Sequence, residues 1–315
     1  MSRHFIEGGI IMKKSLILLL FLIVVVFCGC TNKNNENEDK LDIVTSFYPM
    51  YIATSNIVDG VDDITLTNLT STTVGCLHDY QLTTANLMTI ENSDVLIING
   101  GGMESFIQKV IDSCPNVKVI NSSDGILEKH EEENHEEEHH HDHEENAHIW
   151  VSISLYIDQV NNICNELMRI DNKNAEKYRE NANMYIEKLN ELKKEMHEVL
   201  DGINDNNKNI VTFHEAFEFF AEEFGLNVVG VIEREPGTSP SAGELAEIID
   251  KIKNTNAKAI FVEPQYSKTA ADTISKETGV SIYTLDPVVS GELKKDAYEK
   301  IMRENMKNLK EALED

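Results

Sequence analysis

The sequence predicts an α/β protein in which one long rigid helix links two parallel-sheet lobes, with a metal site in the cleft between the lobes. Strand-like and helix-like patterns alternate along the chain, and such alternation is typical of a parallel sheet covered by helices. The alternation stops at one long amphipathic segment near the middle and then starts again. Histidines and carboxylates gather just before that segment, which favours a metal as the ligand.

The first 30 residues have the pattern of a bacterial lipoprotein signal peptide. Two lysines at 13 and 14 precede an apolar run from Leu16 to Phe27, which is shorter than the roughly 20 residues that a spanning helix needs. Gly29 directly precedes Cys30, so we expect cleavage before Cys30, lipidation of its thiol and anchoring on the extracytoplasmic face of the membrane. Met12 is a more natural start for such a leader than Met1.

The expected first lobe spans residues 41–170 and follows a disordered polar tether at 31–40. Short β-rich runs bounded by turn residues predict its strands, and apolar spacing predicts the helices between them. The expected strands are 41–46, 64–69, 94–98 and 117–120, and the expected helices are 51–58, 84–90 and 104–111.

A linking helix is expected within 171–203. From Tyr178 to Val199, apolar residues recur at alternating steps of four and three, which lays one apolar stripe along a helix. The second lobe, at 204–315, then repeats the alternation. Its expected strands are 209–213, 226–231, 257–262 and 280–285, and its expected helices are 215–224, 242–253, 269–277 and 294–313.

Composition narrows the class of partner. The 315 residues suffice for two domains. A formal net charge of −27 argues against nucleic acid, because phosphate binding needs clustered Lys and Arg, and it favours cations. The five cysteines do not have the spacing of a disulfide framework.

A His-rich acidic loop is expected at 128–147. It alternates imidazoles with carboxylates, a composition that attracts borderline metals such as zinc. Because like charges repel, we expect a mobile segment that samples ions weakly, and a solvated charge run without a ligand role is the alternative. The accessory histidines are His130, His135, His139, His140, His141 and His143.

Four side chains are expected to converge on the cleft: His78, His148, His214 and Asp286. His214 and Asp286 directly follow expected strands, His78 lies in a loop after another, and His148 leaves the acidic tract for an apolar stretch. Ligands of parallel sheets bind beyond the carboxyl ends of strands. Taken singly, each residue could be a turn former or a cap, but together they predict one metal site.

Several short motifs resemble one known family: the metal-binding lipoproteins of bacterial ABC importers, of the zinc-uptake ZnuA type. These motifs are His78–Tyr80, His148–Val151, Thr212–Phe217, Glu235–Ser241, Phe261–Tyr266 and Leu285–Pro287. The resemblance implies that the protein binds one divalent ion and delivers it to a membrane permease with a cytoplasmic ATPase. It also implies that His78, His148 and His214 are ligands, with Asp286, Glu263 or water as the fourth.

Zinc is the favoured metal. Manganese-type relatives place Glu where this chain has His214, and three imidazoles with one oxygen suit tetrahedral Zn(II) better than Mn(II). Glu263 either accepts a hydrogen bond from a metal-bound imidazole and so fixes the orientation of that ring, or makes a salt bridge between the lobes.

Other functions stay open at this point. The chain could serve a manganese or iron importer, or act as a surface adhesin or metal buffer in cell adhesion. A zinc hydrolase is less favoured, because Glu218 stands where an HExxH motif starting at His214 needs its second His. We therefore expect a monomeric binding protein, not an enzyme, and a neighbouring permease gene would favour import.

Overall fold

The computed structural model describes residues 40–72, 77, 80–134, 146–232 and 240–314, without the side chains of 131–134. The chain forms two units, Met1–Lys40 and Leu41–Asp315, and the description below concerns the second. The expected leader, the lipidation site Cys30 and the tether lie outside the described residues. In the part that is described, no helix is long and apolar enough to cross a membrane.

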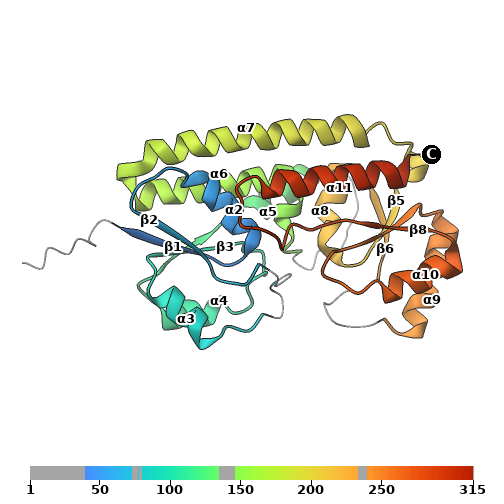
Figure 1. Cartoon of the computed structure of the whole chain (residues 1–315), viewed down its shortest axis with the longest axis horizontal. Helices are drawn as coiled ribbons and strands as arrows, with labels where there is room; N and C mark the ends of the chain where they lie inside the picture. The colour runs from blue at the N-terminus through green and yellow to red at the C-terminus, as the bar shows by residue number, and fades with distance from the viewer. Residues whose placement is uncertain (1–39, 73–76, 78–79, 135–145, 233–239, 315) are drawn as a thin grey trace, which may run out of the picture. The chain divides into compact units, whose positions relative to one another are not determined.

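The first sheet is parallel, with strand order β2-β1-β3-β4 (Figure 1). β1 is central and pairs Ile43 with Leu66 on one side and with Val95 on the other. Its strands are β1 (Leu41–Thr45), β2 (Ile64–Asn68), β3 (Val95–Ile98) and β4 (Lys118–Asn121), and the helices between and after them are α2 (Tyr48–Ile57), α3 (Thr84–Glu91), α4 (Ile107–Ser113) and α5 (Ile126–Asn134).

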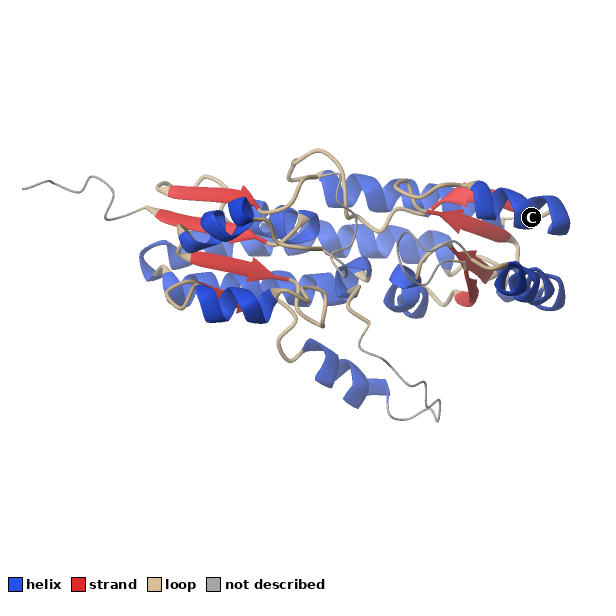
Figure 2. Cartoon of the chain, turned by 90° about the horizontal axis from the view of Figure 1, so that it is seen from below, coloured by secondary structure: helices blue, strands red, loops and turns tan. Residues whose placement is uncertain are grey.

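The second sheet has the same design, with order β6-β5-β7-β8 and parallel pairing throughout. Its strands are β5 (Asn209–Thr212), β6 (Asn227–Val231), β7 (Ala259–Val262) and β8 (Ser281–Thr284). Its helices are α8 (Glu218–Glu223), α9 (Ala242–Thr255), α10 (Thr269–Thr278) and α11 (Ala297–Leu313), and the short turn η4 (Glu215–Phe217) precedes α8. Figure 2 shows helices flanking the strands of each sheet. The predicted α/β class with two parallel sheets is confirmed.

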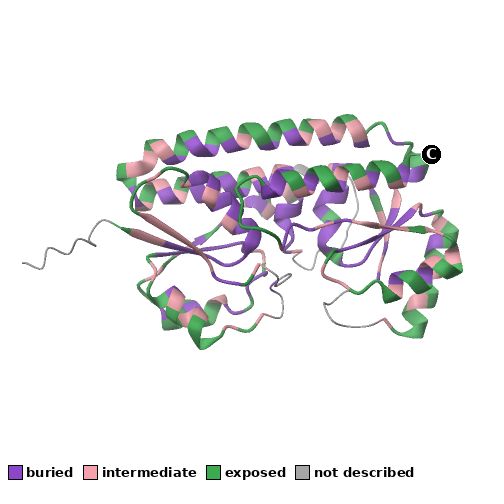
Figure 3. Ribbon diagram, viewed as in Figure 1, coloured by how far each residue is buried: buried purple, intermediate pink, exposed green. Residues whose placement is uncertain are grey.

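Two further helices follow the first sheet: α6 (Ile153–Ile170), after the turn η1 (Ile149–Val151), and the long α7 (Ala175–Leu200), after the turn η2 (Asn172–Asn174). α7 packs against α2, α6 and α11. Its predicted stripe is the buried side of the helix, and its other side is exposed (Figure 3). The stripe ends on Leu200, which is fully buried, rather than on half-buried Val199.

The expectation of a loop throughout 128–147 is wrong at its start, because α5 extends to Asn134. Apolar contacts explain this helix. Ile126 is buried in a small cluster with Ile149, Leu155 and Phe219, and the ring of His130 meets Phe219 edge-on with centroids 5.5 Å apart. Anchoring of the first turn therefore outweighs charge repulsion there. Residues 135–145, with five of the accessory histidines, lie outside the description.

Candidate metal centre

His148 and His214 meet in the interior. His148 directly precedes η1, and His214 stands between Phe213, which follows β5, and η4. Each residue is only 1% exposed, and their Nε2 atoms are 3.2 Å apart. Two nitrogens bound to one tetrahedral zinc at 2.0–2.1 Å would lie about 3.3 Å apart. The two imidazoles are therefore spaced as two ligands of a single ion would be.

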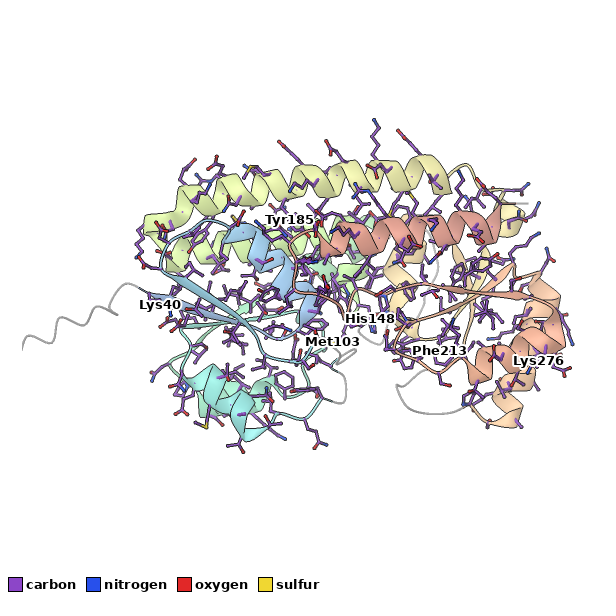
Figure 4. The ribbon with its side chains drawn as sticks, viewed as in Figure 1. Lys40, Met103, His148, Tyr185, Phe213 and Lys276 are labelled. Atoms are coloured by element: carbon purple, nitrogen blue, oxygen red, sulfur yellow. The ribbon has the colours of Figure 1, made fainter. Side chains whose placement is uncertain are left out.

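The backbone that carries His148 is held from both halves of the chain. Asn99, after β3, donates from Nδ2 to the carbonyl of Ala147 at 2.8 Å. From the other half, the Tyr298 hydroxyl on α11 donates to the carbonyl of Trp150 at 2.8 Å. Trp150 in turn donates from Nε1 to the carbonyl of Pro287 at 2.6 Å. In Figure 4, His148 is drawn between Met103 of the first half and Phe213 of the second.

Glu223 adds a further clamp on this segment. Its carboxylate on α8 accepts hydrogen bonds from the backbone N–H groups of Ile153, at 2.7 Å, and Ser154, at 3.0 Å. The hydroxyls of Ser152 and Ser154 donate to the same carboxylate. The first turn of α6 presents backbone N–H groups without intrahelical acceptors, so a carboxylate from 70 residues away completes this helix start.

Asp286 follows β8 and is fixed by its neighbours. Asn305 on α11 accepts from the backbone N–H of Asp286 at 2.8 Å and donates to its carbonyl at 2.7 Å. The carboxylate accepts from the N–H of Val288 at 2.8 Å. Burial raises the pKa of Asp286 to about 6, because a buried carboxylate loses its hydration.

Glu263, directly after β7, is a buried carboxyl group that interacts with Asp286. It is 1% exposed, and burial first, then the charge of Asp286, raises its pKa well above the ordinary value. Gln265 donates to Oε2 at 2.6 Å, while Oε1 has no hydrogen-bond partner in the described ranges. No described Lys or Arg makes a salt bridge with Glu263, but Arg234 lies outside the described residues, so both interpretations of Glu263 stay predictions. One buried and one partly buried carboxyl group, neither paired with a described Lys or Arg, suit a divalent cation.

The expected site is only partly visible. His78 lies outside the description, although the preceding Leu77 is fully buried and donates from its backbone N–H to Met103 Sδ at 3.4 Å. Among the residues that are described, no three His, Cys, Asp or Glu side chains come close enough together to hold a metal. Asp286 is thus not brought into a group with the imidazole pair. His130 lies against α8, where Nε2 is 2.9 Å from Glu222 Oε2.

Sequence reasoning missed the residue that orients His148. Asn146 Oδ1 lies 3.0 Å from the backbone nitrogen and 2.8 Å from Nδ1 of His148. Asn side chains often accept a hydrogen bond from the backbone N–H two residues further along the chain. The Asn at position 146, two residues before His148, could therefore have been recognised in the sequence. Asn99 and Glu223 carry no comparable signal, because they act on residues 48 and about 70 positions away.

Comparisons with known proteins first define the class. The structure resembles that of the solute-binding protein FpvC of Pseudomonas aeruginosa in complex with Mn²⁺, with a TM-score of 0.75 and 29% identity over 87% of this chain and 98% of that one. The two-sheet fold of this chain is therefore that of a solute-binding protein. The family model "Zinc-uptake complex component A periplasmic" (ZnuA) matches residues 43–312. The chain belongs to this family.

Two curated relatives agree with that assignment. The chain is 34% identical to the high-affinity zinc uptake system protein ZnuA of Bacillus subtilis, over 87% of this chain and 88% of the relative. It is 30% identical to the zinc-binding lipoprotein AdcA of Streptococcus pneumoniae, over 95% of this chain. It spans only 61% of the length of AdcA.

Proposed function

We propose that this protein captures Zn(II) outside the cytoplasm and delivers it to an ABC permease that a cytoplasmic ATPase drives. The observation that carries the proposal is the 3.2 Å separation of His148 Nε2 and His214 Nε2, which suits two nitrogens on one zinc. Membership of the zinc-uptake family and the names of the two relatives support it. In this proposal zinc is the cargo, which the protein binds and releases without catalysis.

The proposed coordination sphere adds His78 from the first lobe and an oxygen from Asp286, Glu263 or water. The partly buried carboxyl group of Asp286 and the buried carboxyl group of Glu263 supply negative charge for a dication, and no described Lys or Arg pairs with either of them. The proposal retains the lobe boundaries expected from the sequence, 41–170 and 204–315. Lipid anchoring through Cys30 and a monomeric state complete the proposal.

Manganese is the second candidate cargo, because the FpvC structure contains Mn²⁺. Hard Mn(II) prefers oxygen ligands, whereas imidazole nitrogen suits zinc. The imidazole pair of this chain therefore favours zinc, although an oxygen ligand from Asp286 or Glu263 would be compatible with either ion.

Metal analysis of the purified protein, followed by competitive titration with zinc, manganese and iron, tests this function. We expect zinc to bind most tightly and His214→Ala to abolish tight binding. His197→Ala is the matched control, since His197 lies on α7, where its ring contacts Asp201 and Phe224. Zinc binding of His214→Ala at wild-type affinity would refute the proposal. Tighter binding of manganese than of zinc would identify manganese as the cargo instead.

A further inference from the structure

Asn146 links a proposed metal ligand to the opposite half of the chain. Its Oδ1 accepts from the His148 backbone N–H at 3.0 Å and lies 2.8 Å from His148 Nδ1. Its Nδ2 donates to Glu218 Oε2 at 2.7 Å and to the carbonyl of Glu215 at 3.2 Å. A carboxamide offers one oxygen with two lone pairs and two N–H groups, so these four bonds use its full capacity in one geometry.

The first pair of bonds selects the tautomer of His148. A backbone N–H can only donate, so the atom of Asn146 that it meets must be the oxygen. The same oxygen can only accept from His148 Nδ1, which places the ring proton on Nδ1 in the neutral imidazole. Nε2 then carries the lone pair, and it is Nε2 that faces His214 at 3.2 Å.

The second pair of bonds sets where His148 lies. Glu215 and Glu218 belong to η4 and the start of α8, directly after His214 in the sequence. By binding both, Asn146 ties the segment before His148 to the segment after His214. Asn99 also holds this segment, but its partners Ala147 and Gln159 both belong to the first half of the chain. Asn146 therefore relates one imidazole to the other, next to the bonds that Glu223 on α8 accepts from Ile153 and Ser154.

We propose that Asn146 is a positioning residue for metal binding, which holds the His148 proton on Nδ1 and sets the spacing between His148 and His214. The inference rests on the proposed function, in which both histidines bind zinc. Residues that bond to the second nitrogen of a metal-bound imidazole fix its tautomer and orientation, and their loss typically lowers metal affinity about 10- to 100-fold.

The partners of Asn146 also explain why an amide is needed. An aspartate could accept both bonds from His148, but it could not donate to Glu218, and two carboxylate oxygens would then face each other where the present contact is 2.7 Å. Exchanging the two groups restores the hydrogen bond between positions 146 and 218, because the amide of Glu218→Gln can donate to the carboxylate of Asn146→Asp, whereas the weaker bond to the Glu215 carbonyl, at 3.2 Å, stays lost. The pair therefore offers a rescue that a general packing role would not produce.

The test measures two quantities in each variant: zinc affinity with a competing chelator, and the His148 tautomer by ¹⁵N NMR of the metal-free protein at about pH 8, above the usual His pKa of about 6.5. Asn146→Ala should lower zinc affinity about 10- to 100-fold and move ring proton density onto Nε2. Asn146→Asp should keep the Nδ1 proton but lower the affinity. The double variant Asn146→Asp/Glu218→Gln should recover affinity to within a few-fold of wild type.

The matched control is Asn181→Ala. Asn181 also donates from Nδ2 to two backbone carbonyls, those of Ile57 at 2.9 Å and Asp59 at 2.8 Å, but on α7, so its loss should lower stability and leave affinity and tautomer unchanged. Wild-type affinity and tautomer in Asn146→Ala, or equal affinity losses in Asn146→Ala and Asn181→Ala, would overturn the inference. Unchanged zinc binding in His148→Ala would instead overturn the ligand assignment, and with it the proposed function.

Discussion

Removing the charge of Asp286 should stabilise the metal-free protein. Burial raises the pKa of Asp286 from 3.8 to about 6, so the ionised form is penalised in the fold. Asp286→Asn abolishes this cost and keeps an oxygen that can accept from Val288 N–H, which now donates to Oδ1 at 2.8 Å. A shift of about two units corresponds to about 3 kcal/mol, which is the upper limit of the expected gain in unfolding free energy.

The sign of the pH dependence follows from proton linkage. Between about pH 4 and pH 6 the folded protein retains the Asp286 proton that the unfolded chain has lost, so the stability contributed by this group falls as pH rises through that window. The Asn variant has no such proton. It should therefore be more stable than wild type at pH 8, and the difference should shrink towards zero at about pH 4.

Urea denaturation of the metal-free protein, with a chelator present, measures the effect at about pH 8 and about pH 4.5. Asp62→Asn on the exposed surface is the control and should change stability at neither pH. Zinc should reverse the order at pH 8, because a ligand stabilises the fold that binds it more tightly. An Asn variant no more stable than wild type at pH 8, or equally more stable at both pH values, would refute the reasoning.

Three other outcomes are expected. Zinc affinity should collapse below about pH 6, because imidazole must be neutral to bind metal; an unchanged isotherm at about pH 5 would count against histidine ligands. Deletion of residues 135–145 should cost far less zinc affinity than His214→Ala in the same titration, and equal losses would place the site in the His-rich tract. Glu223→Ala should lower the unfolding free energy by about 2 kcal/mol, since it leaves the start of α6 without its acceptor. Urea denaturation measures this loss, with exposed Glu198→Ala as the control. Equal unfolding midpoints in the two variants would contradict a stabilising role of Glu223.

Local patterns sufficed to predict the two parallel sheets and the long helix. Each expected strand forms within two residues of its predicted ends, because buried parallel strands are short apolar runs with clear turn signals around them. Helix starts were less predictable. α2 begins at Tyr48, three residues early, with a proline in its first turn. α4 begins three residues late, because Glu104 instead accepts from Ser46 Oγ and from the backbone N–H groups of Asn99 and Gly100.

Of the four expected ligands, the structure brings two together, and the residues that hold them were not predicted. His148 and His214 stand out in the sequence because an imidazole next to a strand or an apolar run is unusual, and the structure brings these two together. Asn146 could have been found from its spacing, but its bonds to Glu215 and Glu218 join residues about 70 positions apart. Such contacts depend on how the two sheets are placed, so they cannot be predicted from the residue pattern of either segment alone.

The carboxyl groups of Glu263 and Asp286 indicate what kind of species binds near them. Glu263 is buried and Asp286 is partly buried, the pKa values of both carboxyl groups are raised, and none of the lysines or arginines that the structure describes pairs with them. Replacing such groups by neutral residues would favour folding, so their presence is better explained by a bound species than by stability. A dication compensates both carboxyls, whereas a proton neutralises only one. In the proposed function, the cost that these carboxyls impose on the metal-free fold is the quantity that zinc binding would offset, so Asp286→Asn should lower both that cost and the gain from zinc.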